Sequence, residues 1–344
     1  MYNLKDDYSE GAHPKIIESL VNSNLIQEDG YSMDSFSKEA IRLLKQELNT
    51  DDVDIHFISG GTQTNLLAIS SVLRPHEACI SANTGHIATH EAGAIEATGH
   101  KVVMVDTKDG KLNKELLKPV LQKYNFEYAV KPRVVYISNP TELGTVYSNE
   151  ELKLLYDYCK GNNLLVYLDG ARLASAIAIE EMKLSLEIIN KYSDAFFLGG
   201  TKNGALLGEA LILSNDEFKK DFRHILKQKG AMLAKGRIMG IQFKTLLEDK
   251  LYLKLGAYAN NLAKYTNNEL RNLGIEFLVD SPSNQIFPIL ENNLIKELRK
   301  SFNFYDWEKI NEDKTCIRLV FSWATKEEKV KEFVDLVRKL RKIN

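Results

Sequence analysis

The segment VDIHFISGGTQTNLLAISSVL, residues 53–73, changes from a strand pattern to a helix pattern at a pair of glycines. Val53 to Ser59 predicts a strand, and Thr62 to Leu73 predicts a helix with Leu66 and Ile69 at helical spacing. Gly60 and Gly61 allow a tight turn that leaves free N–H groups at the helix N-terminus. The segment therefore predicts a strand–turn–helix unit that can bind an anion.

The glycine turn matches neither GxGxxG nor the GxxxxGK[ST] of a P-loop. A nucleoside triphosphate is therefore unsupported, whereas one phosphate group fits, with Thr62 and Thr64 as hydroxyl donors. The alternative interpretation is an ordinary helix N-cap with turn glycines.

Strand and helix patterns alternate on both sides of this segment. Further strands are expected at residues 101–106, 133–138, 164–168, 195–198 and 209–213, and helices at residues 112–125 and 149–161. The strand segments are short β-branched or aromatic runs, which are typical of strands buried on both faces. The fold class predicted is α/β, with a mostly parallel central sheet flanked by helices.

From about Asp216 the pattern changes to long helices. We expect helices at 216–246, 253–273 and 326–343, and strands at 275–279, 285–290 and 316–321. This predicts a smaller α+β C-terminal domain. The expected division is an N-terminal segment (1–15), a large α/β domain (16–248) and a small C-terminal domain (249–344).

Composition points to a cytoplasmic globular protein. The 344 residues are 44% hydrophobic and 27% charged, with a net charge of -2, so a strongly basic surface for nucleic acid is absent overall. The N-terminus lacks the apolar stretch of a signal peptide, and no run reaches the ~20 apolar residues of a membrane span. Cys79, Cys159 and Cys316 are too widely spaced for a CxxC pair, and their odd number disfavours a disulfide framework.

Two ionisable residues stand at predicted strand ends. Asp169, in YLDGAR, follows a buried strand at the edge where α/β sheets hold ligands. Its cationic partner is either Arg172 or the protonated nitrogen of a bound heterocycle. Lys202, in GGTKNG, follows another strand, where it can form a Schiff base or can be an ordinary surface lysine.

His86 and His90 are four residues apart in GHIATHE. This spacing could provide half of a metal site, but the order is not HExxH and no third ligand stands at a characteristic distance. A histidine stacked on an aromatic ligand, or hydrogen-bonded in the core, is favoured, and no metal is predicted.

These motifs together resemble pyridoxal-phosphate enzymes of fold type I, and within them the threonine aldolase and β-eliminating lyase family. The resemblance spans residues 7–328 and is carried by DYSEGAHP, HFISGGTQTN, GHIATHEAGAIEATGHKV, YLDGARLASA, GGTKNGALLGEAL and RLVFSWATKEE. It implies pyridoxal 5'-phosphate as the cofactor and a homodimer or homotetramer with shared active sites.

The resemblance also implies roles for individual residues. Lys202 would hold the cofactor as the internal aldimine, Asp169 would pair with the pyridine nitrogen, and His86 would stack on the ring. The phosphate would be bound by Gly61, Thr62 and Gln63, with Thr201 beside the lysine. Arg172 and Arg318 would bind the substrate carboxylate, and Ser9 and Tyr31 would also contact the substrate, Tyr31 in the neighbouring subunit's site.

The reaction implied is cleavage of L-threonine or L-allo-threonine to glycine and an aldehyde, with His86 or His90 as the base. The runner-up is β-elimination on cysteine-type or aromatic amino acids. Relatives carry Glu-Asn-Thr-His where this chain has Ser138 to Glu142, so Thr141 or Glu142 would replace a histidine that helps to read the β-hydroxyl. Their early serine aligns with Asp6, and Ser9 is the nearby substitute.

Overall fold

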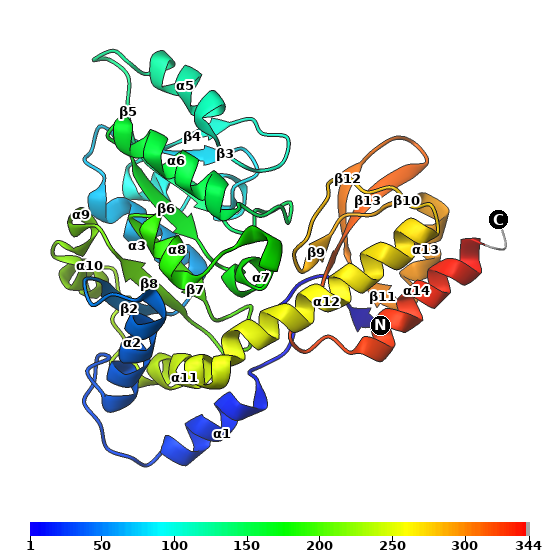
Figure 1. The fold of residues 1–344 in the computed structure, drawn as a ribbon, viewed down its shortest axis with the longest axis horizontal. Coiled ribbons are helices and arrows are strands. Elements are labelled where there is room, and N and C mark those ends of the chain that lie inside the picture. The colour runs from blue at the N-terminus through cyan, green and yellow to red at the C-terminus, as the bar shows by residue number, and fades with distance from the viewer. Residues whose placement is uncertain (342–344) are drawn as a thin grey trace.

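The computed structural model describes residues 1–341. A large α/β body and a smaller body stand side by side, and the long helix α12 (Leu251–Asn272) runs from one to the other (Figure 1). No helix in the described part of the chain is long and apolar enough to cross a membrane.

The large body is built on a seven-stranded sheet with the order β2-β8-β7-β6-β5-β3-β4. Its strands are β2 (Asp54–Ile58), β3 (Glu77–Ala82), β4 (Lys101–Val105), β5 (Lys131–Ser138), β6 (Leu165–Asp169), β7 (Ala195–Gly199) and β8 (Glu209–Leu213). β8 is antiparallel to both of its neighbours, and every other pairing is parallel. The carboxyl ends of six strands and the start of β8 therefore meet at one edge.

Side chains along each strand point alternately to the two faces of this sheet. Both faces carry apolar side chains, and helices cover both of them. In β6, Val166 and Leu168 belong to one buried cluster, and Leu165 and Tyr167 belong to the other. The helices of this body are α1 (Pro14–Ser23), α2 (Ser35–Leu48), α3 (Gly61–Val72), α4 (His86–Thr89), α5 (Lys114–Lys123), α6 (Asn149–Gly161), α7 (Leu173–Ile177), α8 (Leu186–Lys191), α9 (Asp216–Lys219), α10 (Phe222–Gln228) and α11 (Arg237–Leu247).

The smaller body holds a third cluster of buried side chains under short strands. These are β9 (Gln285–Ile286), β10 (Ile289–Glu291), β12 (Tyr305–Lys309) and β13 (Lys314–Val320), with α13 (Asn292–Leu298) and α14 (Glu327–Arg341) packed on them. The N-terminal strand β1 (Tyr2–Asn3) pairs in parallel with β11 (Phe302–Asn303), and Leu4 is fully buried beside it. The first residues of the chain therefore lie on its last part (Figure 1).

Most of the predicted elements are confirmed. The strands expected between residues 101 and 213 correspond to β4 to β8, and the helix expected at residues 149–161 is α6. Its start is fixed by a capping box, in which Ser148 and Glu151 satisfy each other's backbone N–H groups. The mostly parallel sheet of the predicted α/β fold is confirmed as well.

The long helix expected at 216–246 is wrong. Asp221 has a left-handed backbone (φ 55°), and Gly230 has a φ of 73°, so the segment divides into α9, α10 and α11. A helix cannot continue through such residues, and glycine is the residue that adopts this conformation most readily.

The strand expected at 275–279 is also wrong, because this segment forms a single bridge, from Phe277 to Pro288. A proline has no N–H to extend the ladder, and Pro288 likewise divides the strand expected at 285–290 into β9 and β10. The final helix begins at Glu327, and the last residues predicted for it, 342 and 343, lie outside the described residues.

Candidate active site

A cavity of about 740 Å³ opens at the sheet edge where the strand ends meet. Nine of the residues predicted for the site line it: Gly61, Thr62, His86, His90, Asp169, Arg172, Thr201, Lys202 and Arg318. They come from the ends of β2, β3, β6 and β7 and from β13. The topology therefore brings together residues that are far apart in the sequence.

Lys202 lies three residues beyond the end of β7, in a loop held against the start of β8. The amides of Gly200 and Thr201 donate to the carbonyl oxygen of Gly208 (3.1 and 3.2 Å), and the Gly208 amide donates to Thr201 Oγ1 (3.0 Å). Burial lowers the pKa of Lys202, and the nearby Arg172 lowers it further. Both effects favour the neutral amine, which is the nucleophilic form.

Asp169 ends β6 and is surrounded by hydrogen-bond donors. Its Oδ2 accepts from the Tyr136 hydroxyl (2.7 Å) and the Asn65 amide (3.0 Å), and its Oδ1 accepts from the Ala171 N–H (3.0 Å). The carboxylate is 5% exposed, so its remaining access is through the cavity. These donors fix the orientation of the carboxylate, which can pair with a protonated ring nitrogen in the cavity.

The N-terminus of α3 is an uncapped helix end. Its N-cap residue is Gly60, and no side chain of the described chain donates or accepts a cap hydrogen bond there. A Cβ atom placed on Gly60 would meet no atom of residues 1–341 within 4 Å, so the turn opens on free space. Open amides at a helix N-terminus bind anions, as the glycine motif predicts.

His86 is the first residue of α4 and is held by two carboxylates. Its Nδ1 lies 2.8 Å from Glu91 Oε1, and its backbone N–H donates to Glu142 Oε1 (2.8 Å). The ring lies nearly parallel to that of His90, with 5.5 Å between the centroids. Gly85 permits this turn, because a Cβ atom there would lie 2.2 Å from Ser81 Oγ.

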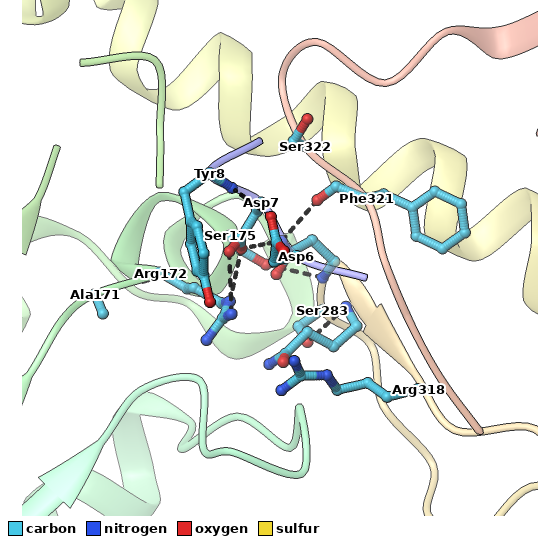
Figure 2. A network of polar contacts seen from close by, with 12 residues as sticks. Asp6, Asp7, Tyr8, Ala171, Arg172, Ser175, Ser283, Arg318, Phe321 and Ser322 are labelled. Carbon is cyan, nitrogen blue, oxygen red and sulfur yellow. Dashed lines mark hydrogen bonds and ion pairs between the residues drawn. The ribbon is translucent and has the colours of Figure 1, made fainter. Parts of the chain in front are cut away.

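Arg172 does not pair with Asp169, so the structural ion pair considered for these two residues is wrong. Its guanidinium instead donates to both carboxylate oxygens of Asp7, at 2.7 and 3.0 Å. Asp7 also accepts from the Asn284 amide (3.0 Å). Figure 2 shows Asp7 and Tyr8 of the N-terminal segment against Arg172. The N-terminal segment thus fixes one of the two predicted arginines.

Arg318 reaches the cavity from β13, with its guanidinium over two aromatic rings of β12. Its guanidinium carbon lies 4.9 Å from the Tyr305 ring centroid and 5.3 Å from that of Trp307. Its Nη2 donates to the carbonyl oxygen of Lys5 (3.3 Å), whereas its buried Nε has no hydrogen-bond partner among residues 1–341. An unpaired buried donor lining a cavity points to an anionic ligand group.

Three predicted site residues do not line this cavity. Gln63 accepts a hydrogen bond from the Ser59 hydroxyl (2.7 Å). Ser9 is exposed and donates to Asp6 (2.7 Å), so Tyr8 takes its place at the cavity wall. Tyr31 is 43% exposed and lies under the ammonium group of Lys227, 4.7 Å from its ring centroid.

Sequence reasoning did not identify several polar residues of the cavity wall. These are Asn65, Ser138 and Glu209. Of the two residues that the sequence offers in place of the missing histidine, Glu142 lines the cavity. Thr141 is buried, with its hydroxyl 2.7 Å from that of Thr145. Burial raises the pKa of Glu142, and Asp169 raises it further. The position of Asn65 one turn into α3 was the signal that could have identified it, because it faces the same way as the glycine turn.

The donor set fits pyridoxal 5'-phosphate. A nucleophilic lysine, a donor-held aspartate and an uncapped helix end match the aldehyde, the ring nitrogen and the phosphate of that molecule. No group of three or more His, Cys, Asp or Glu side chains that could hold a metal ion occurs in residues 1–341.

Comparison with known proteins agrees with this site. The family model of beta-eliminating lyases matches residues 37–292. The low specificity L-threonine aldolase of a Pseudomonas species is 31% identical over 337 residues, which cover 97% of this chain and 96% of that protein. The solved threonine aldolase of Leishmania major is 46% identical, covers 99% of both chains and superposes with a TM-score of 0.97.

The same fold also occurs in more distantly related proteins. An aromatic aminotransferase of Pyrococcus horikoshii has a TM-score of 0.70 at 17% identity, over 99% of this chain and 95% of that one, and it shares the architecture alone. The chain has the fold of the type I pyridoxal-phosphate enzymes. Within that class it belongs to the beta-eliminating lyase family.

Proposed function

We propose that this protein is a pyridoxal-phosphate-dependent aldolase that cleaves L-threonine and L-allo-threonine to glycine and acetaldehyde. The observation that carries the proposal is that Lys202, Asp169, an uncapped helix N-terminus and two arginines all line one cavity. The aldolase relatives favour this reaction over β-elimination.

The cofactor supplies an electron-accepting ring when it is bound, and the chain's own residues position it. Lys202 would provide the amine that attaches it, and Asp169 would pair with the protonated ring nitrogen. The amides of Gly61 and Thr62, with the Thr201 hydroxyl, would bind the phosphate. His86, whose ring Glu91 holds, would pack on the face of the cofactor ring.

The two arginines bind the substrate carboxylate from different directions. Arg318 has an unpaired Nε and a rigid fork of donors, and Arg172 adds a second guanidinium whose orientation Asp7 fixes. Together they hold the amino acid so that its β-carbon faces the histidines. The aromatic rings of Tyr305 and Trp307 line this end of the cavity.

His90 accepts the proton of the β-hydroxyl as the Cα–Cβ bond breaks, and Cα later takes up a proton to give glycine. Burial lowers the pKa of His90, and the adjacent His86 lowers it further, so the imidazole is neutral at neutral pH. A neutral imidazole in the cavity wall is the form that a general base requires. Thr89 Oγ1 lies 2.6 Å from His90 Nδ1 and orients the ring.

The site is completed by a second copy of the chain, in a homodimer or a homotetramer. Apolar side chains of α1 and the loop after it are exposed, with Val21 at 68% and Leu25 at 92%, and Tyr31 lies beyond them on the same segment. Covering this surface with a neighbouring subunit would bring Tyr31 toward that subunit's cavity.

The test is to incubate the purified protein with pyridoxal phosphate and either amino acid, and to measure acetaldehyde and glycine. Equal amounts of the two products establish the aldolase, and the ratio of the two rates gives its preference at Cβ. A yellow protein that releases pyruvate and ammonia instead would replace this reaction with β-elimination.

A further inference from the structure

Gln285 is a buried amide that lines the cavity and has no part in the reaction outlined above. Its side chain is 0% exposed, yet neither its Nε2 nor its Oε1 has a hydrogen-bond partner among residues 1–341. Buried polar atoms in folded proteins are nearly always hydrogen-bonded, so two unpaired atoms on one side chain point to a missing partner. Because Gln285 lines the cavity, a molecule bound there can be that partner.

Strand pairing places Gln285 on the same face of the small sheet as Arg318. Gln285 of β9 pairs with Val320 of β13, and directly paired residues point to the same face. Arg318 is two residues before Val320 and shares that face, because side chains alternate along a strand. The intervening Leu319 and its partner Ile286 lie in the apolar cluster on the other face. Gln285 and Arg318 are therefore diagonal neighbours, and both line the cavity.

The backbone of Gln285 is held by contacts that reach the large body. The Ser281 hydroxyl lies 2.5 Å from the carbonyl oxygen of Gln285 and 3.0 Å from that of Gly144, in the loop after β5. The backbone N–H of Gln285 donates to Ser283 Oγ (3.4 Å). A Cβ atom on Gly144 would lie 2.2 Å from Ser281 Oγ, so glycine is required for this close approach. The amide of Gln285 is therefore presented to the cavity from a fixed backbone.

The unpaired atoms on this face include two donors, Gln285 Nε2 and Arg318 Nε. A carboxylate matches them, because its two oxygens only accept hydrogen bonds. Gln285 Oε1 needs a donor instead, which a water molecule can supply in a polar cavity of about 740 Å³. An apolar side chain would be more stable at this position if no ligand were involved, since an unpaired buried amide is destabilising.

We propose that Gln285 is a substrate-binding residue whose Nε2 donates a hydrogen bond to the α-carboxylate of the amino acid, beside Arg318. Arg318 contributes a charged donor, and Gln285 contributes a neutral donor from the next strand. The carboxylate is thereby bound by this amide in addition to the two arginines. The inference rests on the proposed function, because it requires an amino acid in this cavity.

The experiment titrates the cofactor-loaded, full-length protein with glycine and with methylamine, and follows the visible absorbance of the bound cofactor. Methylamine is glycine without its carboxylate, so the ratio of the two affinities isolates the carboxylate contact. Gln285→Met keeps the length of the side chain and removes both polar atoms. Because hydrogen bonds to charged groups are strong, this variant should bind glycine about 10- to 100-fold more weakly and bind methylamine as the wild type does.

Thermal unfolding of the same proteins separates this role from a structural one. Gln285→Met removes two unpaired buried atoms, so its Tm should stay the same or rise. Gln242 of α11 is the matched control, because it is equally buried but hydrogen-bonded at both ends. Its Oε1 accepts from the Leu206 N–H (2.6 Å), and its Nε2 donates to the Leu207 carbonyl oxygen (3.1 Å). Gln242→Met should therefore lower Tm.

Gln285→Glu adds a test of which end of the amide faces the substrate. It replaces the donor with a second carboxylate, so it should bind glycine more weakly than Gln285→Met does. If Gln285→Met does not fold, the shorter Gln285→Asn decides by the same ratio of affinities.

A glycine-to-methylamine ratio that is unchanged in these variants would overturn the role of Gln285 and leave the aldolase intact. An equal loss of affinity for both ligands would overturn it too, because the effect would not depend on the carboxylate. A cofactor-loaded wild type whose absorbance does not respond to glycine would instead remove the proposed function, and this inference with it.

Discussion

At one end of the cavity, Asp169 and Lys202 lie at the carboxyl ends of two adjacent strands of one sheet, whereas at the other end Tyr8 and Arg318 come from opposite ends of the chain. The first pair is positioned by regular backbone pairing. The second depends on β1, the loop after it and β13 meeting across the two bodies of the molecule. The end that holds Asp169 and Lys202, here called the cofactor end, is therefore positioned by the sheet. The end that holds Arg172 and Arg318, here called the carboxylate end, is positioned by how the chain's termini pack.

The largest effect is expected at the cofactor end, from Lys202→Ala. Loss of the amine removes the covalent anchor, so turnover of L-threonine should fall by at least about 10³-fold. The checks are acetaldehyde release and the visible absorbance of the bound cofactor, which should shift to that of the free aldehyde. Lys111→Ala removes a lysine paired with Glu151 outside the cavity and should keep wild-type activity. Undiminished activity in Lys202→Ala would contradict the assignment.

The next effect is expected from Asp169→Asn. The amide keeps the shape of the side chain but loses the charge that keeps the ring nitrogen protonated, so kcat should fall by about 10²- to 10³-fold. Cofactor affinity and folding should change far less, as measured by absorbance titration and circular dichroism. Asp194→Asn is the matched control. Asp194 is a buried carboxylate that directly precedes β7, at the edge of the sheet opposite the cavity. Wild-type rates from Asp169→Asn would mean that the carboxylate does not act on the ring.

The sequence predicted the cofactor end because its signals are local. A strand pattern followed by glycines or by an acid indicates a strand end, and parallel strand ends meet at one edge. The pairing of Asp7 with Arg172 carries no such signal, since it requires two segments 165 residues apart to touch. Strand β3 was not predicted for a related reason, because its sequence EACISA lacks a β-branched run. It forms a strand because β4 and β5 pair with it on both sides.

At the carboxylate end, Asp7→Asn should destabilise the fold by about 3 kcal/mol at neutral pH, because it leaves Arg172 without a compensating charge. Although burial acts to raise it, the pKa of Asp7 is lowered by Arg172 and Lys202. A depressed pKa in the folded state contributes stability above the unfolded value of 3.8, and this stability is lost as the pH falls through the lower folded value. The stability difference between wild type and variant should therefore be full at pH 7 and shrink in acid.

Denaturant unfolding of both proteins across the acid range measures this difference. Asp249→Asn breaks the exposed pair with Lys15 and should leave stability nearly unchanged at every pH. A wild-type-to-variant gap for Asp7 that stayed constant down to strongly acidic pH would show that the carboxylate charge is not its source.

The smallest effect is expected from Arg318→Lys, which keeps the charge and loses the fork of donors. Because a hydrogen bond to a charged group contributes about 1.5–3 kcal/mol, KM for L-threonine should rise by about 10- to 100-fold while kcat changes by a few-fold. Arg271→Lys is matched to it, since Arg271 also lies over an aromatic ring, that of Phe277, but pairs with Asp280 away from the cavity. Steady-state kinetics with both variants separate the two cases. A fall in kcat at unchanged KM would place Arg318 in the chemistry of bond cleavage, and the division between a cofactor end and a carboxylate end would then no longer hold.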